Sequence, residues 1–145
     1  MAVRVEQKDF DLAQELADFG TGAGAIVTFT GLVRDLPQAP LKYMEIEHYP
    51  AMTHSALTAI EAEARARWPL SDCLILHRYG RLPPGAQIMM VATASPHRKA
   101  AFEAAEFLMD YLKSRAPFWK KEVTADSENW VDSKDVDEQA LDRWR

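Results

Sequence analysis

Hydrophobic and polar residues along the chain form two kinds of pattern, one typical of strands and one typical of helices. Short runs rich in β-branched residues, some alternating with polar residues, predict strands at residues 3–7, 21–34, 41–49, 72–82, 86–95 and 118–126. Apolar residues at helical spacing predict helices at residues 11–19, 52–68, 96–116 and 136–145. Because no internal repeat or long linker divides these elements, the sequence predicts one α+β or mixed α/β domain spanning residues 1–145.

Capping residues and prolines mark the boundaries of the two longest predicted helices. Thr53 is a candidate N-cap for the first of them, and Pro69 ends it. The longest helix has Pro96 at its first position and ends before Pro117. It runs through the apolar residues Phe102, Ala105, Met109 and Leu112. Between the fourth and fifth predicted strands, a β-hairpin turn is indicated by Pro83, Pro84 and Gly85.

The composition is that of an ordinary globular protein, with 48% hydrophobic and 27% charged residues, so disorder is not expected. The formal net charge of −5 argues against nucleic acid as a partner, because nonspecific binding to phosphate backbones needs an excess of Lys and Arg. No stretch, at the N-terminus or elsewhere, reaches the roughly 18 apolar residues that span a bilayer. We therefore expect a soluble, cytoplasmic protein with no membrane partner.

Cys73 is the only cysteine, which excludes an intramolecular disulfide and any Cys-x-x-Cys motif. It lies in a strand pattern, where a buried and unreactive thiol is expected. If the protein handles sulfur, that sulfur must come from another source. His48, His54 and His77 lack the spacing of metal ligands, and the sequence carries no P-loop, dinucleotide or nucleophile-elbow motif. We therefore expect neither a metal nor a cofactor.

The start of the longest predicted helix is a candidate anion site. His97 and Arg98 fall in its first turn, where unpaired backbone N–H groups and the helix dipole favour negative charge. The guanidinium of Arg98 adds bidentate recognition, so a phosphate is a natural ligand. The alternative is that Arg98 is solvated and His97 only caps the helix.

A second group of cations gathers where the same helix ends. Lys113 lies four residues after Met109, so its stem can cross the edge of the core while its ammonium reaches a cleft. In the strand that follows, alternation places Phe118 and Lys120 on one face and Trp119 and Lys121 on the other. The alternative is that these lysines are solvated beside core aromatics.

His97 and Lys113 cannot easily bind one small ligand within a single chain. They are 16 residues apart in one predicted helix, so their backbones stand about 24 Å apart at 1.5 Å per residue. If both ends of the helix belong to one site, two chains must supply them, as in a two-fold dimer. Arg34 is a further candidate, because it follows a strand that is bounded by glycine and precedes the proline-containing loop at residues 35–40.

The chain resembles the large, catalytic subunit of molybdopterin synthase. The resemblance is carried by "GAIVTFTGLVR", "EHYPAMT", "RWPLSDCLILHRYGRL" and "PPGAQIMMVATASPHRKAAFEAAEFLMDYLKSRAPFWKKE". It covers residues 24–130, and the run at residues 97–122 is its most specific part. It implies a single α+β domain of the α/β-hammerhead-like type, with mainly antiparallel strands and a long central helix.

The resemblance implies a sulfurtransferase of molybdenum cofactor biosynthesis. Such enzymes add two sulfurs to cyclic pyranopterin monophosphate and so form the dithiolene of molybdopterin. The sulfur is carried as a thiocarboxylate on the C-terminal Gly-Gly tail of a small ubiquitin-like partner. The implied assembly is a heterotetramer, in which a homodimer of this subunit binds one small partner at each end.

The family's functional positions match particular residues of this sequence. Lys113 and Lys120 are the implied catalytic residues. Substrate binding is implied for Leu32, Val33, Arg34, His97, Arg98, Lys113, Lys120, Lys121 and Glu122. Lys134 falls where relatives have a basic residue, and its role stays open.

The two lysines could act in two ways. As ammonium ions they would steer an anionic tail and stabilise developing oxyanions. As bases they would need a pKa lowered from the usual value of about 10.4, and burial with neighbouring cations would lower it by ~2–3 units. Two other functions stay open: a non-catalytic adaptor that docks a ubiquitin-like tail, and a Schiff-base enzyme that uses Lys113.

Overall fold

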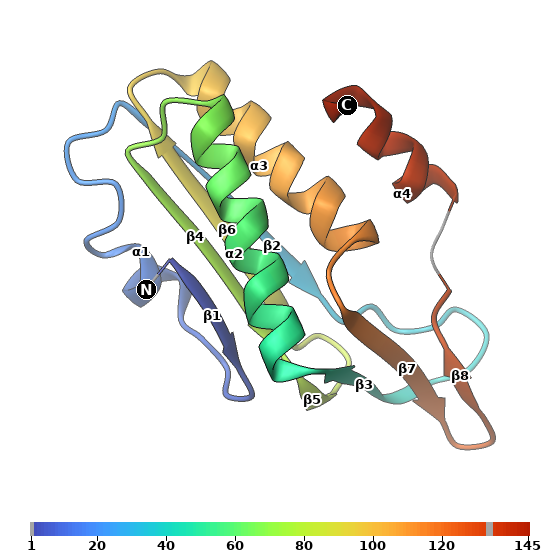
Figure 1. Cartoon of the computed structure of the whole chain (residues 1–145). Helices are drawn as coiled ribbons and strands as arrows, with labels where there is room; N and C mark the ends of the chain where they lie inside the picture. Colours follow the sequence, from blue (N-terminus) through green and yellow to red (C-terminus); the bar gives the residue numbers. More distant parts are fainter. Residues whose placement is uncertain (1, 133–134) are drawn as a thin grey trace.

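The computed structural model describes residues 2–132 and 135–145, which form two four-stranded sheets, and helices cover the first of them (Figure 1). The first sheet has the strand order β1–β4–β6–β2, and its strands are Val3–Glu6 (β1), Asp72–Arg78 (β4), Gln87–Ser95 (β6) and Ala25–Leu32 (β2). The second sheet has the order β5–β3–β7–β8, and its strands are Gly80–Leu82 (β5), Leu41–His48 (β3), Phe118–Thr124 (β7) and Glu128–Trp130 (β8). Only the β1–β4 pair is parallel among these described pairs.

The helices are Leu12–Leu16 (α1), Pro50–Arg67 (α2), Arg98–Ser114 (α3) and Asp135–Ala140 (α4), and α4 continues into a 3-10 turn at Leu141–Trp144. Helices α2 and α3 lie side by side on one face of the first sheet (Figure 1). The expected α+β class, with mainly antiparallel strands and a long helix at its centre, is confirmed. None of the described helices is both long and apolar enough to cross a membrane.

Alternation along β4 explains how the first sheet buries both of its faces. Cys73 and Ile75 belong to the core beneath α2 and α3, whereas Leu74 and Leu76 belong to a smaller cluster with Phe10 on the opposite face. The segment that contains α1 packs against this second cluster. Cys73 is 1% exposed, and burial raises the pKa of its thiol to about 12, so the predicted unreactive thiol is confirmed.

Two predicted helix starts are wrong. Helix α2 begins at Pro50 with Tyr49 as its N-cap, so Thr53 is not the cap; its buried hydroxyl donates to the carbonyl of Tyr49 at 2.9 Å. Helix α3 begins at Arg98, and Pro96 therefore precedes the helix instead of occupying its first position. Both corrections move the predicted helix start by about one turn or less. The ends of helices are the parts that local sequence signals define least well.

The predicted strand at residues 72–82 is two strands that belong to different sheets. Strand β4 ends at Arg78, and β5 begins at Gly80, whose φ of 93° turns the chain so that β5 pairs with β3 instead of β6. The segment that contains Pro83, Pro84 and Gly85 therefore joins the two sheets and is not a simple hairpin turn. Strand β8 was not predicted. Lys134 lies outside the described residues.

Candidate active site

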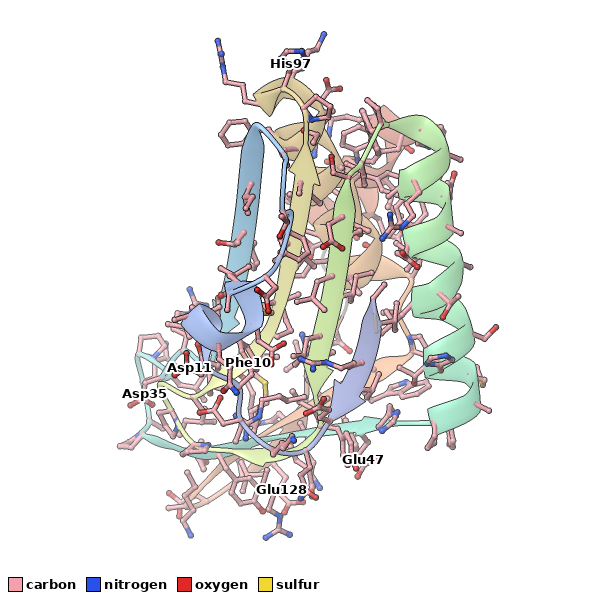
Figure 2. All side chains as sticks on the ribbon, turned by 90° about the vertical axis from the view of Figure 1, so that its left-hand side faces the viewer. Phe10, Asp11, Asp35, Glu47, His97 and Glu128 are labelled. Atoms are coloured by element: carbon pink, nitrogen blue, oxygen red, sulfur yellow. The ribbon has the colours of Figure 1, made fainter. Side chains whose placement is uncertain are left out.

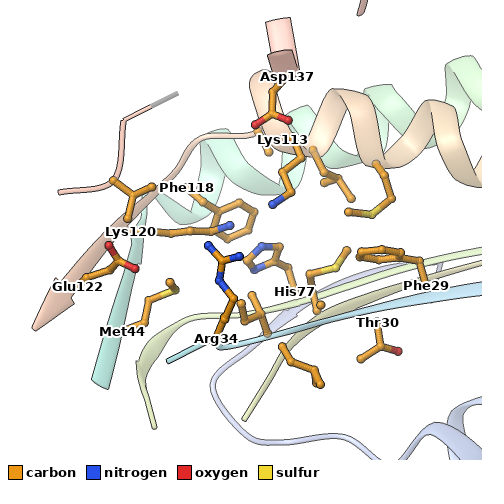
Figure 3. A pocket seen from close by; sticks show the side chains of 18 of the residues that line it. Phe29, Thr30, Arg34, Met44, His77, Lys113, Phe118, Lys120, Glu122 and Asp137 are labelled. Carbon is orange, nitrogen blue, oxygen red and sulfur yellow. The ribbon is translucent and has the colours of Figure 1, made fainter. Parts of the chain in front are cut away.

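A cavity of about 530 Å³ opens where the two sheets meet the last turn of α3 (Figure 3). It is lined by side chains from β2, β3, β4, β6, β7, α3 and α4. The charged residues that line it are Arg34, Lys113, Lys120, Glu122, Asp132 and Asp137, and the main uncharged ones are Phe29, Leu32, Met44, His77, Met89, Met109 and Phe118. The cavity therefore combines three cations and three carboxylates with apolar walls.

Lys113 reaches this cavity from the last turn of α3. Pro117 has no backbone N–H and restricts the residue before it, so the helix cannot continue through this point. The backbone N–H of Arg115 closes the last turn by donating to Tyr111 at 2.7 Å, and the chain then enters β7. This arrangement leaves Lys113 at the cavity mouth, as the sequence predicted.

Lys120 reaches the same cavity from β7. Phe118, Lys120 and Glu122 all line it, so the predicted alternation along this strand is confirmed. Burial lowers the pKa of Lys120 to about 8, and the nearby ammonium of Lys113 lowers it further, whereas Asp137 opposes the shift. Lys120 is therefore still mainly an ammonium ion at neutral pH, but a minor fraction of it is unprotonated.

The positive charge in the cavity is not paired off within the described residues. None of the ion pairs found in residues 2–132 and 135–145 includes Arg34, Lys113 or Lys120. Figure 3 shows the ends of these three side chains turned toward the same space. Lys120 is partly buried, whereas Arg34 and Lys113 are exposed. An anionic ligand would gain from this arrangement, because it would meet several cations at one place.

His77 lines the cavity although the sequence analysis did not select it. It ends the inward-facing series Cys73, Ile75, His77 on β4 and is 3% exposed. Its ring stacks on Phe118, with centroids 3.7 Å apart and planes 14° apart. The one signal in the sequence was a polar residue at an inward position of an apolar strand.

Two of the other predicted substrate-binding residues lie away from the cavity. The side chain of Val33 is 2% exposed, its backbone N–H donates to Ala86, and its carbonyl accepts from Gly85. Lys121 is on the opposite face of β7, where its ammonium pairs with Glu45 at 3.2 Å. Leu32, Arg34 and Glu122, by contrast, all line the cavity.

His97 and Arg98 lie at the far end of α3 and do not line the cavity. Figure 2 shows His97 at one end of the molecule, with Glu47 and Glu128 at the opposite end. His97 is the N-cap residue, but its side chain makes no capping hydrogen bond, so it does not act as the cap that was considered as the alternative. A single protomer thus separates the two predicted parts of the site.

Among residues 2–132 and 135–145, no cluster of three or more His, Cys, Asp or Glu side chains is arranged to hold a metal ion. The side chains that line the cavity supply ammonium, guanidinium, carboxylate and imidazole groups. These groups can bind anions, stabilise oxyanions and move protons.

Comparison with known proteins places this geometry in a family. The model of the MoaE protein family matches residues 5–115. A molybdopterin synthase catalytic subunit from Cereibacter sphaeroides is 63% identical over 99% of this chain and 100% of the relative. A second one, from Pseudomonas aeruginosa, is 52% identical and covers 99% of both chains.

Solved structures agree with the sequence comparisons. The molybdopterin biosynthesis MoaE protein from Burkholderia ambifaria is 51% identical, with a TM-score of 0.83 over 99% of this chain and 98% of that one. Since the match extends over nearly the whole of both chains, it includes the cavity as well as the sheets. The chain belongs to the MoaE protein family.

Proposed function

We propose that this chain is the catalytic subunit of a molybdopterin synthase. It transfers two sulfurs to cyclic pyranopterin monophosphate, each from the thiocarboxylated C-terminal Gly-Gly tail of a small ubiquitin-like partner. The product carries the dithiolene of molybdopterin, and the reaction takes place in the cytoplasm as a step of molybdenum cofactor biosynthesis. The names of its full-length relatives support catalysis over the role of a non-catalytic adaptor.

The observation that carries the proposal is the convergence of Lys113, Lys120 and Arg34 on one cavity of about 530 Å³. A thiocarboxylate tail and a cyclic phosphate are both anions, and both need cations at one place. A ligand that fills the cavity displaces water from beside the apolar lining, which strengthens each electrostatic interaction with the reacting groups.

In this site the thiocarboxylate sulfur attacks a substrate carbon that bears an oxygen. A C–S bond forms as the C–O bond at that carbon breaks, and the departing oxygen takes up a proton. Water then attacks the acyl carbon, so the sulfur stays on the substrate and the tail leaves as a carboxylate. Lys113 and Lys120 stabilise the oxyanion that forms at the acyl carbon. A pKa of about 8 leaves Lys120 mainly an ammonium ion at neutral pH, but it also allows the side chain to exchange a proton during the reaction.

The remaining substrate contacts come from a second protomer. His97 and Arg98 of the partner protomer bind the phosphate together with Arg34 of this one. The outer edge of β2 supports such a dimer, because β2 pairs only with β6 within the described sheet. Ile26, Phe29 and Leu32 on this strand are large and exposed. Because Phe29 and Leu32 also line the cavity, a copy packed on this edge adjoins the site.

One small partner binds at each end of the homodimer, which gives a heterotetramer. Besides the two lysines and the partner's His97 and Arg98, the substrate-binding residues that keep this role in the proposal are Leu32, Arg34 and Glu122. Val33 acts instead by holding the strand end to Ala86, and Lys121 acts by pairing with Glu45.

The proposal is tested by reconstitution. The purified chain is incubated with the thiocarboxylated small partner and cyclic pyranopterin monophosphate, and dithiolene formation is measured. Lys113→Ala and Lys120→Ala should each lower product formation by about 100-fold or more, a loss typical of removing a group that stabilises an oxyanion.

The exposed Lys42 on β3 provides a matched control, since it does not line the cavity. Lys42→Ala should leave turnover unchanged. All variants should still form dimers and bind the small partner. Near-normal turnover by either cavity variant would reject its catalytic role, and absence of turnover by the wild-type chain would reject the function.

A further inference from the structure

The imidazole of His77 lines the cavity that also holds Arg34, Lys113 and Lys120. Its side chain is nearly completely buried, and the floor that it forms is closed on one side by the stacked ring of Phe118. Figure 3 shows the imidazole lying among the ends of Arg34, Lys113 and Lys120. A buried polar group at such a place needs a hydrogen-bond partner, or its desolvation remains uncompensated.

The hydrogen bond made by Nδ1 fixes the tautomer of this ring. Nδ1 lies 2.7 Å from the backbone carbonyl of Arg78, and a carbonyl can only accept, so Nδ1 carries the proton. Nε2 of the neutral ring is therefore an acceptor. No hydrogen bond to Nε2 is found within residues 2–132 and 135–145, so this nitrogen is available to a ligand in the cavity.

The electrostatic surroundings keep the ring neutral. Burial lowers the pKa of His77 to about 3, and the charge of Lys120 contributes to this shift, with smaller contributions from His48 and Lys113. His77 is thus unsuited to act as a general base, because a group with so low a pKa holds a proton weakly. Its available chemistry is that of a permanent acceptor.

On the basis of the function proposed above, we propose that Nε2 of His77 binds the substrate by accepting a hydrogen bond from an N–H group of the reduced pterin ring. The pterin is the part of the substrate that carries N–H donors and a flat, uncharged surface. The phosphate offers mainly acceptors, and an acceptor facing another acceptor is unfavourable. His77 therefore selects the orientation in which the pterin enters first and the phosphate stays nearer the cavity mouth.

Two amide substitutions separate this role from a purely structural one. His77→Asn places an amide N–H near the position of Nδ1, so the link to Arg78 can persist while the acceptor in the cavity is lost. His77→Gln places its amide oxygen near the position of Nε2, so the acceptor persists while the link is lost. Both variants lose the aromatic stacking on Phe118, which makes them matched controls for each other.

We expect His77→Asn to raise the KM and the Kd for the cyclic pterin by about tenfold or more, with a smaller effect on kcat. His77→Gln should change both by about threefold or less. His48→Asn is a further control, since His48 also lies near Phe118 but binds Thr53 and does not line the cavity. If His77 has only a structural role, the affinity of each variant for the cyclic pterin should instead fall in step with its thermal stability.

A measurement on the wild-type chain does not depend on how these variants fold. In a ¹⁵N spectrum of the histidine side chains, His77 should show an unprotonated Nε2 whose resonance shifts when the cyclic pterin binds, as it would on accepting a hydrogen bond. An unchanged resonance at saturating substrate, or wild-type affinity in His77→Asn, would overturn the inference. If the wild-type chain makes no dithiolene, the proposed function itself fails. If it turns over normally but the His77 resonance does not change on binding the cyclic pterin, only this inference is rejected.

Discussion

At the scale of single residues, the site depends on Lys120, whose charged form is destabilised by burial and by a neighbouring cation. Lys120 lies on β7, half-buried, and it faces the ammonium of Lys113 across the same cavity. The native state therefore holds the proton of Lys120 less tightly than the unfolded chain does, where the pKa is near its usual value. Function and stability oppose one another at this residue.

Lys120→Met should therefore stabilise the protein at neutral pH. Below pH 8 both states of the wild type hold this proton, and the desolvation cost in the native state is fully present. Between pH 8 and about 10.5 the native state loses the proton first, so wild-type stability rises with pH. Urea unfolding should show Lys120→Met more stable by about 1–3 kcal/mol at pH 7, and the difference should shrink at pH 9.5.

Equal stability of the two proteins at pH 7, or a difference that grows with pH, would show that Lys120 is well solvated.

Lys113→Ala offers a second check on the same residue. Removal of its charge should raise the pKa of Lys120, which can be followed by NMR titration of labelled lysine side chains.

Some of these residues could be found from the sequence, and others could not. The face shared by Phe118 and Lys120 follows from the two-residue period of a strand, so alternation alone located it. The place of His77 at the cavity depends on its stacking against Phe118, which lies on a strand of the other sheet. This is a contact between segments far apart in the sequence, and no local pattern encodes it.

At the scale of elements, the sequence pattern located most strands and helices but not the way they join. The run at residues 72–82 has a continuous strand pattern, yet Gly80 turns the chain into the second sheet. A glycine inside an apolar run does not show that the residues before it and the residues after it pair with strands of different sheets. The start of α3 also depends on a contact, because its first turn packs beside the strand that precedes it.

That junction between β6 and α3 should be intolerant of any side chain at Gly24. A Cβ placed there would stand 2.1 Å from the carbonyl oxygen of Pro96, whereas the backbone N–H of Gly24 already donates to Ser95 at 3.1 Å. Gly24→Ala should therefore lower the free energy of unfolding by about 1–3 kcal/mol or more, measured by urea unfolding.

Gly31→Ala is the matched control, because its Cβ would make only ordinary contacts, the nearest with the sulfur of Met89 at 3.5 Å. It should cost less than Gly24→Ala. Equal losses in the two variants would mean that the approach of Pro96 to Gly24 does not restrict this junction.

At the scale of the whole molecule, the length of α3 separates the two cationic groups. Its two ends lie about 24 Å apart, and Figure 2 shows His97 at one extreme of the protomer. The cavity at the other end has Lys113 and Lys120 but neither His97 nor Arg98. The central claim of our account is that a two-fold dimer brings the start of α3 from one protomer to the cavity of its partner.

The most direct measurement of this claim is dithiolene formation by mixed dimers of His97→Ala and Lys113→Ala chains. When equal amounts are unfolded and refolded together, half of the dimers should be mixed, and each mixed dimer should have one intact site. The account predicts recovery of about a quarter of wild-type activity, although each parent variant alone is nearly inactive. Activity no higher than that of the parents, with mixed dimers shown to form, would contradict a site shared between protomers.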